Sequence, residues 1–224
     1  MEKYNIQLDI VELTPRDFDL AAVLLAKGFY NNPAHEYIFV DPSTRMELLQ
    51  WGLKANLKLN FAPLMAIGQS FALVEKNQPP GKRPIKAMAC WHPPEYSSPG
   101  FIAQITSGWL LAPFKFGKET CQRLSEVLTA IEGIKEQVLA QNKAWYLNNM
   151  VVDRELRGMG IGTELLCQQL QSKVIPSGFP AILMTQKGTN VRFYQKLGFK
   201  IAHKSTIGTG ENAFINWCLI FDES

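Results

Sequence analysis

The sequence predicts a single α/β domain, residues 1–224, built on a mixed sheet. Strand-like and helix-like segments interleave along the chain in the order β-α-α-β-β-α-β-α-β-α-β-β. An uncharged strand-like segment, 145–152, runs into a turn with glycine at positions 158, 160 and 162. With 46% hydrophobic and 19% charged residues in a chain of 224, the protein can bury a core, and the composition excludes disorder.

In the first half, residues 6–13 alternate as a strand does. The segment Thr14-Pro15-Arg16-Asp17 has the pattern of a helix start, with Thr as N-cap and Pro in the first turn, and this helix is expected to run to about Gly28. A second helix is expected after residues 41–43. Segments 64–74 and 85–91 then predict an antiparallel hairpin.

Residues 93–117 form an insertion that is rich in Pro, Gly, Phe and Trp. The elements expected after it are a helix at 118–142, strands at 145–152 and 181–185, helices at 160–174 and 191–197, and a closing hairpin of 199–206 with 213–221. Gly198 suits the left-handed end of the helix at 191–197.

Charge and cysteine usage exclude several classes of protein. A net charge of +3 is too small to indicate nucleic-acid binding. The four scattered cysteines, Cys90, Cys121, Cys167 and Cys218, indicate reduced thiols rather than a disulfide framework or a zinc site. No signal peptide is apparent at the N-terminus, and the uncharged stretch 96–114 is too short in its apolar part to span a bilayer, so we expect a cytoplasmic protein.

The turn after residues 145–152 is the strongest functional signal. Its glycines let N–H groups converge at a helix N-terminus, which favours an anion, and Arg157 adds a cation. Alternatively, the glycines only permit close packing. The third glycine of a dinucleotide fingerprint is replaced by Thr163, and the pattern of a Walker A loop is absent.

The segment Arg157-Gly158-Met159-Gly160-Ile161-Gly162 resembles the R/Q-x-x-G-x-G/A signature of the GCN5-related N-acetyltransferase (GNAT) superfamily. Residues 190–199, with Asn190, Tyr194 and Gly198-Phe199, resemble a second block of that family. The shorter segments 28–33 and 90–94 are similar to the puromycin-acetyltransferase-like subgroup, which acetylates small amines. The motif-level resemblance covers roughly residues 145–200.

The resemblance implies a GNAT-like acyl-CoA N-acyltransferase fold, with a mostly antiparallel sheet whose fourth and fifth strands splay apart. It implies acetyl-CoA as co-substrate and no metal. The residues expected to hold acetyl-CoA are Met150, Val151 and Val152 for the pantetheine, Arg157, Gly158, Met159, Gly160, Ile161, Gly162 and Thr163 for the pyrophosphate, and Asn190, which is also expected as a helix N-cap. Tyr194 is expected to protonate the departing thiolate, although it could simply be a core aromatic.

The general base is open, because Met184 stands where relatives commonly have Glu. The candidates are Glu36, Asp41, His92 and Glu95, or a water molecule. The acceptor pocket is expected to include some of the aromatic residues Phe29, Tyr30, Tyr37, Trp91, Tyr96 and Trp109. The insertion at 93–117 is expected to act as a lid or as a surface for a partner subunit, such as a second copy in a homodimer.

The function that follows is direct acetyl transfer from acetyl-CoA to a primary amine of a small molecule, without nucleic-acid or membrane partners. Two alternatives remain open. One is acetylation of a protein lysine or N-terminus, and the other is a non-catalytic acyl-CoA-binding module.

Overall fold

The computed structural model describes residues 8–61, 69–76 and 78–223. Its first half contains β1 (Leu8–Glu12), a 3-10 turn (Pro15–Asp17), α1 (Phe18–Phe29), α2 (Pro33–Ile38), α3 (Pro42–Phe61), β2 (Gln69–Glu75), β3 (Ile85–His92), α4 (Phe101–Ser107), a 3-10 turn (Trp109–Leu111) and α5 (Ala112–Phe116). The second half contains α6 (Lys118–Leu139), β4 (Trp145–Val152), α7 (Ile161–Gln169), a π-helical segment (Leu170–Val174), α8 (Ile175–Ser177), β5 (Ala181–Thr185), α9 (Gly188–Gln195), β6 (Lys200–Ile207) and β7 (Phe214–Phe221).

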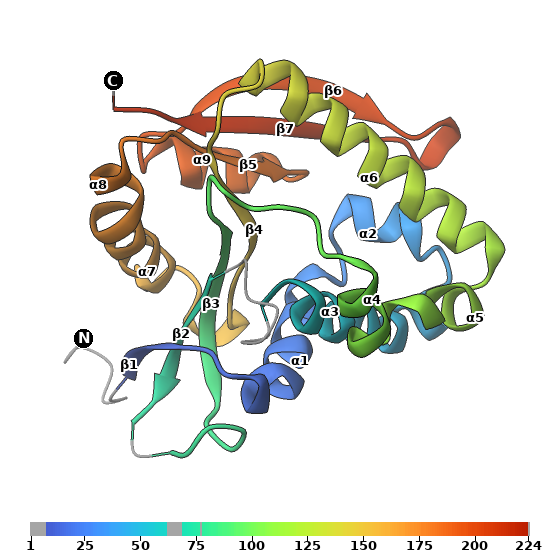
Figure 1. Ribbon diagram of the computed structural model, residues 1–224, viewed down its shortest axis with the longest axis horizontal. Helices are drawn as coiled ribbons and strands as arrows, with labels where there is room; N and C mark the ends of the chain where they lie inside the picture. The colour runs from blue at the N-terminus through green and yellow to red at the C-terminus, as the bar shows by residue number, and fades with distance from the viewer. Residues whose placement is uncertain (1–7, 62–68, 77, 224) are drawn as a thin grey trace.

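The strands form a seven-stranded sheet in the order β1-β2-β3-β4-β5-β7-β6 (Figure 1). All neighbours pair antiparallel except β4 and β5, which run parallel. The predicted mixed α/β sheet is therefore confirmed, and so is the antiparallel pairing of the two strands expected at 64–74 and 85–91. Residues 6–7, 64–68 and 77, which those predictions included, lie outside the described residues.

Helices cover both faces of the sheet because the side chains of each strand alternate between two cores. Leu147 and Trp91 pack on one face with residues of α7 such as Leu165. Cys90 and Val151 face the other side, where α1 and α3 cover them. Further along that second face, α2 packs against β7 and α6 packs against β6, and α5 joins the same core through α6. No helix in the described parts of the chain has both the length and the apolarity needed to cross a membrane.

Several elements differ from the sequence predictions, among them α2 and the helix after the glycine turn. Helix α2 was not predicted, although Asn32 caps it by accepting a hydrogen bond from the N–H of Ala34 at 2.9 Å, and Pro33 follows as its first residue. A helix of six residues is too short to display a 3.6-residue period. The helix expected at 160–174 is α-helical only to Gln169 and continues as a π-helical segment.

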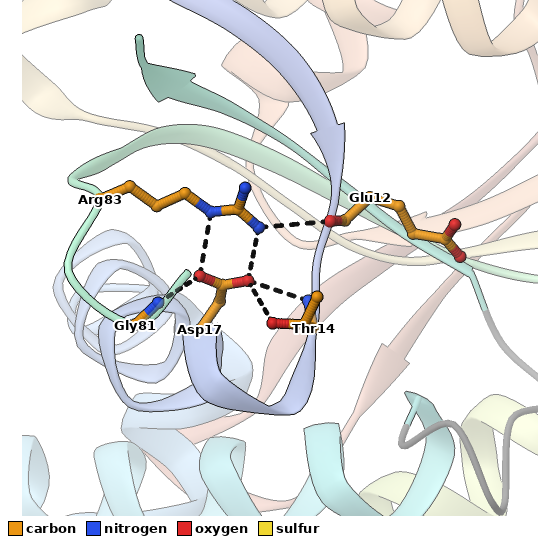
Figure 2. Close-up of polar contacts among 5 residues, drawn as sticks. All are labelled: Glu12, Thr14, Asp17, Gly81 and Arg83. Atoms are coloured by element: carbon orange, nitrogen blue, oxygen red, sulfur yellow. Dashed lines mark hydrogen bonds and ion pairs between the residues drawn. The ribbon is translucent and has the colours of Figure 1, made fainter. Parts of the chain in front are cut away.

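A buried ion pair fixes the start of α1 to the loop between β2 and β3 (Figure 2). The Arg83 guanidinium donates hydrogen bonds to both carboxylate oxygens of Asp17, at 3.0 and 2.6 Å. The same carboxylate accepts from the N–H of Gly81 and from both the N–H and the hydroxyl of Thr14. Burial alone would raise the pKa of Asp17, but the bonds from Arg83, Thr14 and Gly81 outweigh it and hold the pKa at about 2.

Candidate active site

Strands β4 and β5 separate after a short stretch of pairing. Their register covers only Trp145 to Leu147 of β4 opposite Ala181 to Leu183 of β5, whereas β4 continues to Val152. The pairing geometry thus leaves the second half of β4 without a partner on its β5 side. An extended ligand can pair with such an edge as an added strand does.

The opening begins at a β-bulge in β4. Cys90 of β3 lies opposite Asn149 and Trp91 lies opposite Leu147, so Asn148 is the extra residue. Its side-chain nitrogen is buried and has no hydrogen-bond partner among the described residues.

The glycine-rich turn follows β4 and leads directly into α7. The Asp153 carboxylate caps its first residues by accepting from the N–H of Glu155 at 3.1 Å. Gly158 and Gly160 have φ angles of +80° and +83°, a conformation that favours glycine, and a Cβ atom at either position would meet open space. Gly160 immediately precedes α7, so the first N–H groups of this nine-residue helix point out of the turn.

Arg157 lies at the base of this turn. Its Nε donates a hydrogen bond to the carbonyl of Val152 at 3.1 Å, which ties the turn to the end of β4. Its Nη2 lies 4.0 Å from the place where a Cβ of Gly28 would stand. The guanidinium is therefore held between β4 and the C-terminal end of α1.

Helix α9 contributes the opposite wall. Asn190 was expected as its N-cap, and this expectation is wrong: α9 begins at Gly188, so Asn190 is the third helical residue. The Asn190 side chain donates to the Thr185 hydroxyl at 3.2 Å, which anchors α9 to the end of β5. Tyr194 is 8% exposed and lies edge-on to Phe193 and Phe199. Burial raises the pKa of the Tyr194 phenol, so it stays protonated.

These elements enclose a cavity of about 750 Å³. Of the residues predicted for the site, those that line it are Met150, Val151, Val152, Arg157, Gly158, Gly160, Ile161, Gly162, Thr163, Asn190 and Tyr194. Met159 does not line the cavity; its side chain is 38% exposed. The lining residues that the sequence analysis did not name for the site are Gly28 and Asn32 from α1 and its end, Leu156 from the turn, and Lys187, Thr189, Arg192, Phe193 and Lys196 around α9.

Phe29 had been considered only for the acceptor pocket. Lys187, Arg192 and Lys196 had a signal in the sequence, because residues 186–200 contain no acidic residue. In the part of the chain that the structure describes, none of these three cations forms a salt bridge. They face the same cavity as the glycine turn. The cavity therefore pairs a set of helix-terminal N–H groups with a cationic wall, which suits a polyanionic ligand.

The cavity extends to Phe29 and Asn32, where a chain of amides begins. Asn32 donates to the side-chain oxygen of Gln186 at 3.0 Å, and Gln186 donates to that of Asn216 at 2.6 Å. Asn216 in turn lies 3.5 Å from the sulfur of Met184. Asn32 is the member of this chain that lines the cavity, and its bond to Gln186 fixes its side chain there.

The other aromatic residues proposed for the acceptor pocket lie elsewhere. Tyr30 donates to the carbonyl of Pro42, and Tyr37 donates to Glu126 at 2.6 Å. Trp91 is 1% exposed in the core, Tyr96 stacks on His92 at 3.8 Å, and Trp109 lies in the insertion. Among the six aromatic candidates, Phe29 alone lines the cavity.

The four candidate bases also lie away from the cavity lining. Glu36 is ion-paired with Arg45 at 3.5 Å, and Asp41 accepts hydrogen bonds from Ser43. His92 is stacked between Tyr96 and Phe61, and burial lowers its pKa to about 3, which makes it a poor base. Glu95 follows β3 in the insertion. No set of three His, Cys, Asp or Glu residues within the described ranges could hold a metal ion.

Comparison with known proteins agrees with this arrangement. Residues 125–201, from the middle of α6 to the start of β6, match the model of the acetyltransferase (GNAT) domain family. Among curated proteins, a probable serine/threonine-protein kinase of Dictyostelium discoideum is 24% identical over 212 residues, which are 88% of this chain and 21% of that protein. The chain therefore spans about a fifth of the length of this relative.

Solved structures share the fold over almost the whole chain. A Corynebacterium glutamicum protein described as a histone acetyltransferase and related acetyltransferase has a TM-score of 0.64 at 16% identity, with 98% of both chains covered. The arylalkylamine N-acetyltransferase 2 of Aedes aegypti has a TM-score of 0.60 at 12% identity, covering 97% of this chain and 100% of that one. The polyamine N-acetyltransferase of Drosophila melanogaster has a TM-score of 0.57 at 11% identity, covering 96% and 100%.

The splayed sheet and the glycine turn define the acyl-CoA N-acyltransferase class of fold. Over residues 125–201 the chain matches the model of the GNAT acetyltransferase domain, and it shares its overall fold with acetyltransferases of known structure.

Proposed function

We propose that the protein transfers an acetyl group from acetyl-CoA to a primary amine of a small molecule, by direct attack within a ternary complex. The observation that carries this proposal is that the unpaired end of β4, the glycine turn and Tyr194 border one cavity. We extend the proposal to the whole chain as one acetyltransferase domain, in the cytoplasm, where its four free cysteines would stay reduced.

The residues of the cavity fit acetyl-CoA part by part. The N–H groups of the turn from Gly158 to Thr163 and the side chain of Arg157 would hold the pyrophosphate. The unpaired edge at Met150 and Val151 would pair with the pantetheine. The carbonyl of Val152 already accepts a hydrogen bond from Arg157. The pairing of β4 with pantetheine would therefore depend mainly on the residues that precede Val152.

When bound, acetyl-CoA supplies the thioester whose carbonyl carbon forms the new C–N bond as the C–S bond breaks. An N–H group of β4 near the bulge would stabilise the negative charge that develops on the carbonyl oxygen. Tyr194 would donate its phenol proton to the departing sulfur. Since the four candidate bases do not line the cavity, we propose that a water molecule removes the proton from the attacking amine.

The acceptor end of the site supports a small molecule. Tyr37 of α2 lies directly against Gly208 after β6, where a Cβ atom would stand 2.5 Å from the Tyr37 ring. The hydrogen bond from Tyr37 to Glu126 also joins α2 to α6. Although these residues lie outside the cavity lining, we propose that their contacts close the side on which an extended peptide would need an open groove. Acetylation of a protein lysine or N-terminus would require the contacts of Tyr37 with Gly208 and Glu126 to break.

A matched pair of glycine variants tests the co-substrate site. Gly160 and Gly178 both have positive φ angles and open space where a Cβ would stand. Gly160 precedes α7 and Gly178 follows α8, but of the two only Gly160 lines the cavity. We expect Gly160→Asp to abolish micromolar binding of acetyl-CoA in calorimetry, because the carboxylate would meet the pyrophosphate. Gly178→Asp should retain that binding.

Turnover is then measured as thiol release with a panel of small amines. Release that depends on both the amine and an intact turn would establish the proposed reaction. Binding without release for any small amine, peptide or protein acceptor would instead indicate a non-catalytic acyl-CoA-binding module. No binding by the unsubstituted protein would contradict the proposal.

A further inference from the structure

The insertion that contains α4 and α5 has its large apolar residues on the outside. Its buried side chains are mostly small, since Ala103, Ser107 and Ala112 face inward together with Phe116. We call its exposed side chains the apolar ridge: Phe101 (68% exposed), Ile102 (75%), Ile105 (51%), Leu110 (41%), Leu111 (58%) and Phe114 (88%). Burying small residues while exposing large ones is the reverse of what a monomeric surface favours.

The ridge is also uncharged. Residues 96–114 contain no Asp, Glu, Lys or Arg. The following residue, Lys115, is engaged by Glu47 of α3, with 2.6 Å between Nζ and the carboxylate. The two short helices pack against α3 on their inner side. They lie at the right of Figure 1, whereas α7 and α8 lie at the left.

We infer that the apolar ridge is the contact surface for a second copy of this chain, in a two-fold symmetric dimer. An isologous contact brings each patch against its own copy, so a patch that carried charge of one sign would repel itself. An uncharged ridge avoids that repulsion. Its six side chains expose on the order of 700 Å² in total, which is close to the roughly 800 Å² per partner that a standard interface buries.

The charge pattern favours a second copy over a lipid surface. Peripheral binding to anionic lipids combines apolar side chains with exposed cations. Within 97–117 the sole cation is Lys115, and Glu47 neutralises it. Within 97–117 the insertion therefore supplies no unpaired cation to such a surface.

Sedimentation equilibrium of the purified chain at 1–100 µM tests the inference. We expect a species of about twice the 25.2 kDa mass of one chain. Phe114→Glu and Ile102→Glu should each weaken the dimer at least tenfold, because both place two like charges at the contact. Phe179→Glu is the matched control: Phe179 is also an exposed aromatic, at 37%, and follows α8 at the other end of the molecule. That variant should remain dimeric.

A second readout locates the contact without relying on a disruptive charge. Leu111→Cys should form an intermolecular disulfide under mild oxidation, whereas the native chain, whose part-exposed thiols are Cys121 and Cys167, should not. A monomer at every concentration would overturn the inference. So would a dimer that is indifferent to both ridge variants. Binding of the monomer to vesicles of phosphatidylcholine and phosphatidylserine, lost in Phe114→Glu, would also overturn it and assign the ridge to a lipid surface.

Discussion

Gly28 of α1 lies directly against Val151 of β4, so a Cβ atom on residue 28 would overlap the Val151 Cγ2 atom. Both residues line the cavity, and the Arg157 guanidinium lies beside them. Because β4 is held by its pairing with β3, we expect Gly28→Ala to push α1 away from the strand. The expected cost is about 1–3 kcal/mol in the free energy of unfolding, measured by urea denaturation, with weaker binding of acetyl-CoA.

Two further variants isolate the cause. Val151→Ala removes the overlapping atom, so adding it to Gly28→Ala should return part of the lost stability. Gly133→Ala is the control, since Gly133 lies within α6 and has open space around it. That substitution should stabilise the protein by about 0.5–1 kcal/mol. If Gly28→Ala behaved in the same way as Gly133→Ala, the close approach of α1 to β4 would be refuted.

Asp17→Asn should be strongly destabilising, because it leaves Arg83 buried without its counter-charge. We expect a loss of about 3–5 kcal/mol at pH 7. Asp19→Asn is the matched control, because Asp19 lies two residues further on, in the first turn of α1. The Asp19 side chain is 71% exposed and pairs with Lys54 at the surface, so its loss should cost about 0.5 kcal/mol or less. Equal effects of the two substitutions would contradict the structural role of the Asp17–Arg83 pair.

The same pair predicts a dependence of stability on pH. The pKa of Asp17 in the folded state, about 2, lies below its usual 3.8, so the pair's contribution is fully present above about pH 5. It is lost as the pH falls toward 2, and the loss amounts to about 2 kcal/mol. Urea denaturation at pH 7 and pH 3 should therefore show a smaller difference between the native protein and Asp17→Asn at the lower pH. A difference that does not change with pH would rule out the lowered pKa.

Tyr194→Phe should lower kcat by about a hundredfold or more while leaving the Kd of acetyl-CoA nearly unchanged. The reason is that Tyr194 is proposed to donate a proton only as the C–S bond breaks. Tyr146→Phe is the control, because burial raises the pKa of this phenol too, although Tyr146 does not line the cavity. Unchanged turnover in Tyr194→Phe would show that Tyr194 is a core aromatic and not the acid.

The cations of α9 should contribute to the affinity for acetyl-CoA. We expect Arg192→Gln and Lys196→Gln each to raise its Kd about three- to tenfold, and the effect should shrink between 50 and 300 mM salt. Lys200→Gln removes an exposed cation of β6 that does not line the cavity, so it should leave the Kd unchanged. Calorimetry at the two salt concentrations measures all three variants. An equal rise of the Kd in all three variants would mean that the affinity depends on the net charge of the protein and not on the cations that line the cavity.

Much of the side of the cavity that we propose for acetyl-CoA could be predicted from the sequence because it is contiguous. The strands at 145–152 and 181–185 have the predicted bounds, since each is an uncharged apolar run between charged or turn residues. The glycine turn was also predicted, because its conformation depends on local residues. Helix α9 begins three residues earlier than expected, since its N-cap, Lys187, makes no side-chain capping bond that would mark the start.

The acceptor side could not be predicted, because the fold brings together residues that are far apart in the chain. Asn32 and Gln186 are 154 residues apart in sequence, and Asn216 lies 30 residues beyond Gln186. No local pattern links these three amides. The apolar ridge was visible in the sequence as an uncharged stretch. Gly108 and Pro113 interrupt the helical repeat of its apolar residues, so the sequence did not show which side faces the core.

The brief pairing of β4 with β5 has a mechanical consequence. Only three residue pairs connect the four strands before that junction to the three strands after it. Under tension across the sheet this seam would part first, and in amide exchange its N–H groups should open ahead of those in the long β6–β7 ladder. A pantetheine lying in the gap would bond to the exposed edge and stiffen the seam. The co-substrate would then serve for a time as part of the sheet that holds it.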